Sequence, residues 1–573
     1  MQKIVECVPN FSEGHDLTLI DQITSAIAQV EGVTLLDVDP GADTNRTVVT
    51  FVGGPEATVE AAFQGIKRAS ELIDMRNHTG AHARMGATDV CPFIPVSNMT
   101  MEECAELSRI LGKRVGEELN IPVYLYEYSA ASPERENLAK VRAGEYEGLS
   151  EKLKDPFWKP DFGKAEFNAS AGATVMGARK FLIAYNVNLN TRDQKKATDI
   201  ALEIREAGRN ARDPKTNKFV RDEQGTPIKR PGTLKAVKAV GWYIDEYNMA
   251  QISMNLVDME VTPFHIAFDE VVKQADLRGL RVSGSELVGL IPLTAMLDAG
   301  KYYLKKQHSS TAVSNAELIR IAIQSMGLNE ISPFNPQERI IEYQLGSKDE
   351  KNLVDMGVTE FVDELASDSP APGGGSVSAL ASSMAAGLTN MVGVLTYGKK
   401  GYQANWDEIE VLSNQAQTLK DTFLFLVDED TRSFNNVMAA MRLPKKSDEQ
   451  QAVRLQALQE ATVYSAEIPL RVMRHSLEIM KLAARMAEIG NQNSLSDAGV
   501  AVLQARAGLE GAALNVLINI PGIDDQDIVS KFKAEVSSLK SESSALADKV
   551  LSAMTNKLLT PNDLVNVPYP HPT

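Results

Sequence analysis

Residues 79–92 (TGAHARMGATDVCP) bring together side chains that can move a proton and hold an anion. His82 precedes Arg84 by two residues, Asp89 follows, and glycines lie on both sides of the histidine. A histidine with a pKa of about 6.5 can act as base and acid near neutral pH. An arginine can hold a carboxylate, and an aspartate can orient either partner. The spacing leaves a second interpretation open, in which His82 only makes a loop hydrogen bond.

Residues 161–180 (DFGKAEFNASAGATVMGARK) combine glycines with cations. Glycines let the backbone approach a ligand closely, and Lys164, Arg179 and Lys180 can offer positive charge to an anion. Arg205, in the next helical pattern, can serve the same anion, although such arginines are more often solvated. The alternative interpretation is a loop that leads into a strand.

Residues 369–378 (SPAPGGGSVS) form a Pro-Gly loop that runs into a helical pattern. Three consecutive glycines let backbone N–H groups converge, and Ser376 can cap the helix, whose N-terminus favours an anion or a polarised carbonyl. A plain helix entry is the alternative. Because three glycines exceed what such an entry needs, the sequence favours a ligand site.

Two aspartates lie within the helical pattern of residues 427–434 (VDEDTRSF). Asp428 and Asp430 are two residues apart and therefore point in different directions. Asp428 can pair with Arg432 on the helix surface. Asp430 falls on the apolar side shared with Phe434, where an unpartnered carboxylate is costly, and this indicates a functional role.

Residues 490–500 (GNQNSLSDAGV) form a polar junction before an alanine-rich helical pattern. Ser496 or Asp497 either caps this helix or contacts a ligand, and the sequence leaves both interpretations open.

Two unlike halves must position these residues. Strands are predicted over residues 34–38, 46–53, 123–128, 180–189 and 250–258, and helices over 55–70, 193–207 and 263–277. This mixture indicates α/β or α+β layers up to about residue 307, with a polar loop over 210–233. Helices over residues 376–397, 407–443, 448–489, 496–519 and 524–556 then predict an all-α bundle.

Composition narrows the classes of function. The net charge of −17 argues against a general nucleic-acid role, which needs a basic surface. The three cysteines form no CxxC pair, so neither a disulfide framework nor a structural zinc site is expected, and a reducing cytoplasm fits best. The N-terminus lacks the pattern of a signal peptide. The uncharged stretch 376–397 is long enough to span a membrane, but its Ser, Thr, Ala and Gly content favours a closely packed soluble helix.

Ordered motifs of the first half resemble the glutamate formimidoyltransferase family over essentially all of residues 1–307. They are CVPNFSEG (7–14), DVDPGADTNRTVVTFVG (37–53), HARMGATDVCPFIP (82–95), GATVMGARKFLIAYNVNL (172–189) and VSGSELVGLIP (282–292). The resemblance implies two α/β sandwich lobes, residues 1–180 and 181–331, whose sheets face each other across a substrate tunnel. It implies His82 as the catalytic residue and a folate-contacting loop at 163–172, with 203–205 nearby. The residues expected to bind substrate or folate here are Arg84, Asp89, Gly163, Lys164, Ala165, Glu166, Phe167, Asn168, Ala169, Ser170, Ala171, Gly172, Glu203, Ile204 and Arg205.

The chemistry that this resemblance implies fits one neutral histidine. The 5-nitrogen of tetrahydrofolate attacks the amidine carbon of N-formimidoyl-L-glutamate, and the glutamate amine leaves protonated. His82 can take the first proton and return it. No metal is required, and the cations can hold the glutamate tail of the folate, which is expected to be polyglutamylated.

Motifs of the second half, with MVGVLTY (391–397) and ALNVLIN (513–519), resemble the cyclodeaminase/cyclohydrolase family over about residues 359–556. The resemblance implies a helical domain, residues 359–560, that dimerises with its site near the dimer interface, and it implies Asp430 as the catalytic residue. Asp430 can accept the proton of the attacking 10-nitrogen or protonate the departing ammonia; both remain open. The residues expected to bind folate here are Gly373, Gly374, Gly375, Ser376, Asn491 and Asp497.

Joined through a linker at 332–358, the two modules predict a two-step enzyme of histidine degradation and one-carbon metabolism. The first module makes 5-formimidoyltetrahydrofolate, and the second converts it to 5,10-methenyltetrahydrofolate and ammonia. The rival predictions are a transferase fused to a methenyltetrahydrofolate cyclohydrolase and a folate-binding scaffold protein. We expect a cytoplasmic homo-oligomer built from dimers, with no nucleic-acid, membrane or metal partner.

Overall fold

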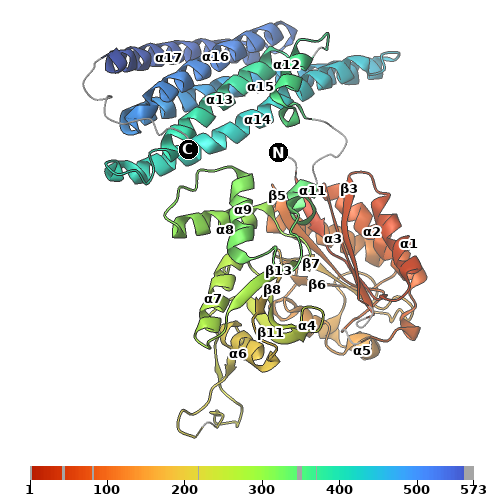
Figure 1. The fold of residues 1–573 in the computed structure, drawn as a ribbon. Helices are drawn as coiled ribbons and strands as arrows, with labels where there is room; N and C mark the ends of the chain where they lie inside the picture. The colour runs from red at the N-terminus through yellow and green to blue at the C-terminus, as the bar shows by residue number, and fades with distance from the viewer. Residues whose placement is uncertain are drawn as a thin grey trace. The chain divides into compact units, whose positions relative to one another are not determined.

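The computed structural model describes residues 3–41, 45–80, 83–216, 218–344, 352–369 and 371–559 (Figure 1). The chain divides into two compact units. The first comprises Met1–Ala299 and Ala322–Gly346, and the second comprises Gly300–Ile321 and Ser347–Thr573. Strands and helices are mixed in the first unit, whereas the described residues of the second form helices without strands. The predicted α+β and all-α classes are therefore confirmed.

A seven-stranded sheet forms the first lobe of the first unit. Its strands are β1 (Ile4–Cys7), β2 (Asn10–Phe11), β3 (Val33–Gly41), β4 (Arg46–Gly53), β5 (Thr88–Ser97), β6 (Val123–Glu127) and β7 (Thr174–Ala178). The order is β1-β4-β2-β5-β7-β6, with β3 beside β4. The pairs β5–β7 and β6–β7 are parallel, and the other pairs are antiparallel.

Helices α1 (Leu17–Ala28), α2 (Pro55–Leu72) and α3 (Met101–Glu118) cover one face of this sheet (Figure 1). In α2, Val59, Phe63 and Ile66 recur at helical spacing and are buried against the sheet. The start of α3 is fixed by a capping box between Thr100 and Glu103, which satisfies two backbone donors. The short helices α4 (Leu138–Val141) and α5 (Glu145–Lys152) pack on the opposite face.

The second lobe is a four-stranded antiparallel sheet of order β11-β12-β8-β13. Its strands are β8 (Ile183–Leu189), β11 (Val237–Ile244), β12 (Met249–Leu256) and β13 (Val282–Val288), and α6 (Gln194–Ile204) and α7 (Phe264–Asp276) accompany them. Alternation in β8 sends Tyr185 and Val187 to one face, and Asn186 and Asn188 to the other. This second face is polar although buried: Gln251 Nε2 donates to Asn188 Oδ1 at 2.6 Å.

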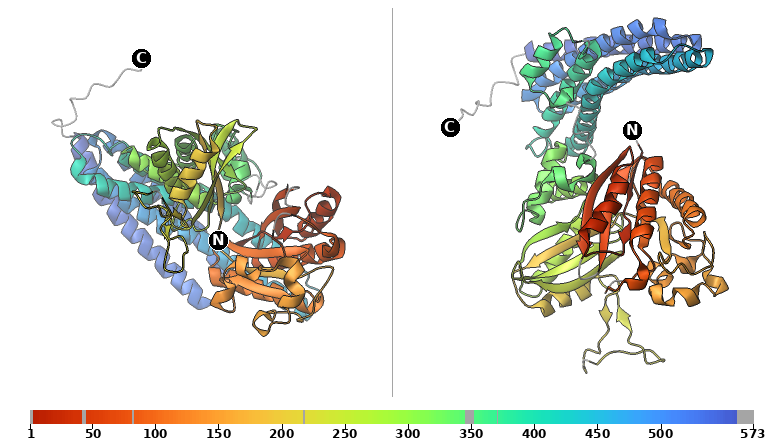
Figure 2. Two further views of the ribbon diagram at one scale, coloured as in Figure 1. Left: turned by 90° about the horizontal axis from the view of Figure 1, so that it is seen from below. Right: turned by 90° about the vertical axis from the view of Figure 1, so that its right-hand side faces the viewer.

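The polar segment 210–233 is more ordered than the predicted loop. Strands β9 (Arg209–Asn210) and β10 (Lys229–Arg230) pair to form a ribbon that projects from the second lobe (Figure 2). Two further bridges, Arg212 to Phe219 and Arg221 to Pro227, continue the pairing. The segment therefore forms a hairpin, and the prediction of a loop is wrong for its paired residues.

The chain leaves the second lobe through α8 (Leu293–Lys306), α9 (Asn315–Met326), α10 (Pro336–Arg339) and α11 (Ile341–Gln344). Ile340 and Ile341 are fully buried, and Ile340 bridges to Ile291. Residues 336–344 of the predicted linker thus pack within the first unit.

The helical unit contains α12 (Val358–Leu365), α13 (Gly374–Val394), α14 (Trp406–Arg442), α15 (Asp448–Ile489), α16 (Leu495–Asn519) and α17 (Gln526–Leu559). Small residues bring its helices close together. A Cβ added at Gly508 of α16 would lie 2.0 Å from Ser382 Oγ of α13, so only glycine fits there. Ser382 Oγ also bonds to Ser476 Oγ of α15 at 2.7 Å.

Among the described residues, α13 is the helix whose length and composition would let it cross a membrane. Half of its most apolar window is buried inside the protein. Since a core helix of a soluble protein meets the same criterion, this is weak evidence for a span.

Within the helical unit, Glu410 of α14 anchors the segment Gly300–Ile321. Its carboxylate accepts hydrogen bonds from Ser310 Oγ at 2.7 Å, Thr311 N at 2.8 Å and Thr311 Oγ1 at 2.6 Å. Burial raises the pKa of Glu410, but the hydrogen bonds from Thr311 and Ser310 outweigh it and the net pKa is lowered.

We expect Glu410→Ala to lower the free energy of unfolding by about 1–3 kcal/mol at pH 7, the worth of hydrogen bonds to a charged group. A lowered carboxylate pKa stabilises the fold above the pKa of the unfolded chain, and this stabilisation is lost as the pH falls through the folded pKa. In urea unfolding, the difference between parent and variant should therefore shrink below about pH 4.3. Glu408→Ala, which removes an exposed pair with Arg485, is the matched control and should change stability little. Equal stability of Glu410→Ala and parent at pH 7 would contradict the anchoring role.

Candidate active sites

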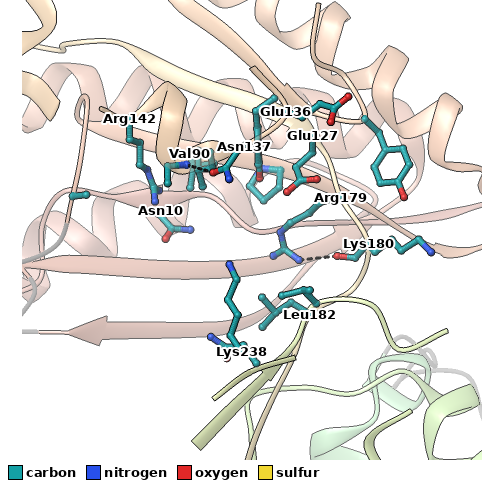
Figure 3. Close-up of a pocket in the computed structure, with 18 of the residues that line it drawn as sticks. Asn10, Val90, Glu127, Glu136, Asn137, Arg142, Arg179, Lys180, Leu182 and Lys238 are labelled. Atoms are coloured by element: carbon teal, nitrogen blue, oxygen red, sulfur yellow. Dashed lines mark hydrogen bonds between the residues drawn. The ribbon is translucent and has the colours of Figure 1, made fainter. Parts of the chain in front are cut away.

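A cavity of about 1010 Å³ lies within the first unit, and both of its sheets contribute to the lining (Figure 3). The first lobe contributes Asn10, Pro92 and Tyr126, and the second contributes Lys238 and Asn255. The two sheets therefore face each other across the cavity, as the resemblance implied.

Two cations in this cavity are placed to hold an anion. Arg179 and Lys238 come from different lobes and extend toward the same part of the cavity (Figure 3). Among the described residues, the Arg179 guanidinium donates only to the backbone carbonyl of Lys180, and Lys238 makes no ion pair. Lys180 itself is paired with Asp258 and Glu260, at 2.7 and 2.6 Å. Lys238 was not predicted; its place in the alternating strand VKAVGWYI was the available signal.

His82 lies outside the described residues, but its neighbours border two hollows. Ala83 lines the large cavity. Gly80 and Arg84 line a second pocket of about 450 Å³, together with Gly144 and Glu147. Residues on either side of the predicted catalytic histidine in the sequence therefore line pockets.

The Arg84 side chain is nearly buried, and its guanidinium already donates hydrogen bonds to other side chains of the protein. Its guanidinium donates to Glu145 at 3.0 Å, to Glu147 at 2.6 Å, and through Nε to His78 Nδ1 at 3.2 Å. Hydrogen bonding to Glu147 raises the pKa of Arg84. In this structure two glutamates occupy the position predicted for a substrate carboxylate.

Asp89 pairs with an arginine that the sequence did not predict as its partner. It is fully buried, pairs with Arg142 and accepts a hydrogen bond from Met85 N at 3.0 Å. Burial raises the pKa of Asp89, although Arg142 opposes the rise. Of the two partners that the sequence left open for Asp89, Arg84 is not paired with it, because residues 142–147 supply the partners of both side chains, and His82 lies outside the described residues. Arg142 in turn lines the large cavity, which the sequence did not predict.

The predicted folate loop, residues 163–172, packs beside the segment that follows His82. Ala173 N donates to Met85 O, and Gly86 bridges to Gly172. A Cβ added at Gly172 would lie 2.2 Å from Met85 O, and φ of this glycine is +68°, so the close approach requires glycine. Loop and histidine segment are therefore adjacent, although no loop residue lines the large cavity.

The interior of the loop is largely exposed. Lys164, Ala165 and Glu166 point to solvent, and the Phe167 ring lies 5.5 Å from that of Tyr146. Asn168 Oδ1 accepts hydrogen bonds from Ser170 Oγ and Ala171 N, and Tyr146 donates its hydroxyl to Ala169 O.

Residues 203–205 end α6, and none of them lines the large cavity. Ile204 is buried in the core of the second lobe. Glu203 pairs with Arg230 at 2.6 Å, and Arg205 Nε donates to Gly208 O at 3.0 Å. These contacts fix the base of the β9–β10 ribbon.

Glu6 is a buried carboxylate that sequence reasoning missed. It is 3% exposed on β1, and burial raises its pKa to about 7, against the lowering effect of Arg179. A raised folded pKa favours folding when the group is protonated, so stability falls as the pH rises from about 4.5 through 7.

We therefore expect Glu6→Gln to raise the free energy of unfolding at pH 8 by on the order of 2–3 kcal/mol. The gain should vanish near pH 4, where the parent carboxyl is protonated. Chemical unfolding at both pH values measures the effect. A variant less stable than the parent at pH 8 would show that the charged carboxylate is stabilising there.

In the helical unit, Asp430 of α14 meets the glycine-rich start of α13. Asp430 Oδ2 accepts hydrogen bonds from Ser376 N at 2.9 Å and from Ser376 Oγ at 3.2 Å. A Cβ added at Gly375 would lie 2.1 Å from Asp430 Oδ1, so this contact requires glycine. Burial raises the pKa of Asp430, and the Ser376 hydrogen bonds lower it less than burial raises it. The structure thus brings the predicted catalytic aspartate and the predicted ligand loop together.

Ser376 does not cap α13 as predicted. Gly373 is the N-cap residue, and Ser376 lies in the first turn, where its hydroxyl also donates to Val427 O at 2.9 Å. The Ser376 side chain therefore links α13 to α14 and does not cap α13.

The surface role predicted for Asp428 is also wrong. Asp428 is buried and accepts a hydrogen bond from Leu353 N at 2.6 Å. Arg432 pairs with Glu429 and donates to Asn352 Oδ1. The segment around Leu353 covers this face of α14, which local spacing could not reveal.

Asn491 and Asp497 lie at the other end of α13. Asn491 N donates to Thr396 Oγ1 at 2.8 Å, and its Oδ1 accepts from Lys399 Nζ at 3.1 Å. Helix α16 begins at Leu495, so Asp497 lies in its first turn and neither it nor Ser496 is the N-cap. A helix of 21 residues is about 30 Å long. Within one chain, Asn491 and Asp497 therefore do not join Asp430.

Comparisons with known proteins cover nearly the whole chain. Three family profiles match: the formiminotransferase domain, N-terminal subdomain, over residues 4–179; the formiminotransferase domain over 184–346; and formiminotransferase-cyclodeaminase over 357–538. The formimidoyltransferase-cyclodeaminase of Rattus norvegicus is 43% identical over 556 residues, 97% of this chain and 99% of the rat protein. The chain belongs to the formimidoyltransferase-cyclodeaminase family.

Separate relatives of this family match each half. A glutamate formimidoyltransferase of Streptococcus pyogenes is 44% identical over 305 residues, 53% of this chain and 94% of that protein. A methenyltetrahydrofolate cyclohydrolase of Methylorubrum extorquens is 38% identical over 201 residues, 35% of this chain and 97% of that protein. The family profiles also place residues 300–321 with the transferase sequence, although they fold with the helical unit.

Proposed function

We infer that the protein transfers the formimidoyl group of N-formimidoyl-L-glutamate to tetrahydrofolate and then cyclodeaminates the product. The main support for this function is the full-length similarity to formimidoyltransferase-cyclodeaminases, in which one chain holds both modules. The product of the first reaction is the substrate of the second. The overall products are glutamate, ammonia and 5,10-methenyltetrahydrofolate, and we propose that the two reactions serve histidine degradation and one-carbon metabolism.

For the transfer step, we propose that the large cavity holds the substrates. Carboxylates of the formimidoylglutamate or of the folate tail would bind Arg179 and Lys238, which are available in the cavity. His82, next to the cavity-lining Ala83, would take the proton of the attacking 5-nitrogen and return it to the departing glutamate nitrogen. The folate loop 163–172 lies beside the same segment and supports this placement.

For the cyclodeamination step, we propose that Asp430 exchanges protons with the reacting nitrogens. Its Oδ2 is held by Ser376, and its Oδ1 has no hydrogen-bond partner among the described residues. A carboxyl whose pKa is raised by burial can hold a proton long enough to pass it on. The same group can then accept the proton of the 10-nitrogen and deliver it to the departing ammonia.

The cyclohydrolase similarity of the helical half supports a rival second activity, hydrolysis of the methenyl bridge. Supplying 5-formimidoyltetrahydrofolate directly separates the two. The proposed cyclodeaminase releases one ammonia for each methenyltetrahydrofolate formed. A cyclohydrolase would release no ammonia and would consume methenyltetrahydrofolate instead.

We propose that the protein is a cytoplasmic homo-oligomer built from dimers. Two neighbouring helices expose apolar side chains at heptad-like spacing: Val377, Met384 and Met391 on α13 with Leu395 at its C-cap, and Val500, Leu503, Leu514 and Ile518 on α16. Such a stripe is typical of a helix that packs on another subunit. Sedimentation of the parent and of Met384→Lys, expected to dissociate, tests the dimer; an unchanged mass would reject this face.

We further propose polyglutamylated tetrahydrofolate as the natural co-substrate, with no metal, nucleic-acid or membrane partner. The long anionic tail would stay bound while the head moves between sites. Less free 5-formimidoyltetrahydrofolate should then appear with a long-tail folate than with the monoglutamate. Equal release with both would reject the retained tail.

A further inference from the structure

The motif ALNVLIN, residues 513–519, places Asn515 of α16 beside the glycine-rich start of α13. A Cβ added at Gly374 would lie 3.2 Å from Asn515 Nδ2 and 3.6 Å from its Oδ1. The next glycine, Gly375, makes the corresponding approach to Asp430 of α14. Because α13 packs against both α14 and α16 (Figure 1), its first turn brings the amide and the carboxylate to neighbouring positions.

The hydrogen bonds of Asn515 leave part of its side chain unused. Nδ2 donates to Gly511 O at 2.9 Å, one helical turn earlier, which fixes the orientation of the amide. Oδ1 accepts no hydrogen bond from any described residue, and the side chain is half-buried. Asp430 shows the same division, with Oδ2 held by Ser376 and Oδ1 without a hydrogen-bond partner among the described residues. Two oriented oxygen acceptors therefore lie at the same turn, and no residue in the described part of the chain donates to either of them.

Exposed apolar side chains lie within one helical turn of these residues along the chain. Phe434 follows Asp430 by one helical turn, Val377 follows Ser376, and Ile518 follows Asn515 by three residues. All three are more than a third exposed, at 39%, 37% and 77%. Polar acceptors within an apolar rim resemble the composition of small-molecule sites.

We propose that Asn515 is a substrate-contacting residue of the cyclodeaminase site, whose Oδ1 accepts an N–H of the departing amidine nitrogen. The inference rests on the proposed role of Asp430. In the reaction, the substrate enters as the protonated amidinium, a bond forms between the 10-nitrogen and the amidinium carbon, and the proton of the 10-nitrogen passes to Asp430. Asp430 returns that proton to the terminal nitrogen, the carbon–nitrogen bond breaks, and ammonia leaves with the bonding electrons. Asn515 holds that nitrogen toward the carboxyl while the proton moves.

The test supplies 5-formimidoyltetrahydrofolate to the full-length parent, Asn515→Ala and Asn515→Leu. We expect kcat/KM for ammonia release to fall by about 10- to 100-fold in both variants, as for loss of one hydrogen bond to a charged group. In both variants we expect KM to rise and kcat to fall. Formimidoyl transfer by the same preparations should keep its rate, which shows that the transferase module is folded.

Asn519→Leu is the matched control, one turn further along α16. Asn519 Nδ2 donates to Ser465 O and to Asn515 O, so this variant removes two structural hydrogen bonds. It should lower the unfolding temperature without raising KM. Ammonia release by Asn515→Ala within twofold of the parent would overturn the proposal, as would an unchanged KM with a fall in kcat shared by Asn519→Leu. Asp430→Asn tests the underlying assignment separately, because normal deamination by that variant would reject Asp430 alone.

Discussion

Asp430→Asn is expected to abolish ammonia release from 5-formimidoyltetrahydrofolate while formimidoyl transfer continues at its parent rate. The amide has nearly the same shape and keeps an oxygen that can accept from Ser376 N, so the fold around α13 should persist. It cannot take up a proton near neutral pH, and general acid–base catalysis contributes about 10²- to 10⁴-fold. Ammonia is measured with purified full-length protein at saturating substrate.

Asp421→Asn provides the control on the same helix. Asp421 pairs with its neighbour Lys420 near the surface, and its loss should leave both activities within twofold of the parent. If Asp430→Asn deaminates as fast as the control, proton transfer must be carried by another group.

His82→Ala is expected to reduce formimidoyl transfer by about 10²-fold or more while cyclodeamination of added 5-formimidoyltetrahydrofolate is unchanged. The transfer must remove a proton from the 5-nitrogen and give one to the departing glutamate, and Arg84 and Asp89 are already committed to ion pairs. Glutamate release from N-formimidoyl-L-glutamate measures the loss.

His15→Ala, on the exposed N-terminal side of α1, is the control for the histidine replacement. It should transfer at the parent rate. Partial recovery of His82→Ala by added imidazole would support proton transfer as the missing function, whereas normal turnover without imidazole would remove His82 from the mechanism.

Long helices were the most predictable part of the fold. The prediction over residues 448–489 coincides with α15, because polar breaks at both ends bound a helical pattern that continues through Pro469. Strand β5 was missed. Its residues from Thr88 to Ile94 are all buried, since one face packs on the helices and the other on α4, α5 and the cavity, so no alternation marks it as a strand. Strand β7 is likewise buried throughout and contains Gly177, a poor strand signal.

The family resemblance implied that Asp430 and the Gly-Gly-Gly-Ser turn belong to one site, but the sequence did not predict the partners that come from distant parts of the chain. Arg84 donates to Glu145 and Glu147, which follow it by about 60 residues. Asp428 accepts a hydrogen bond from Leu353, which precedes it by 75 residues. Asn515 is another residue whose contact comes from a distant part of the chain. Its motif was visible in the sequence, but its approach to Gly374 depends on the packing of α16 against α13.

One experiment tests the central claim most directly: the purified chain is given N-formimidoyl-L-glutamate and tetrahydrofolate, and glutamate, ammonia and 5,10-methenyltetrahydrofolate are followed together. We expect all three to appear in equal amounts, with glutamate first. Glutamate without ammonia would contradict the second activity, and the absence of all three products would contradict both.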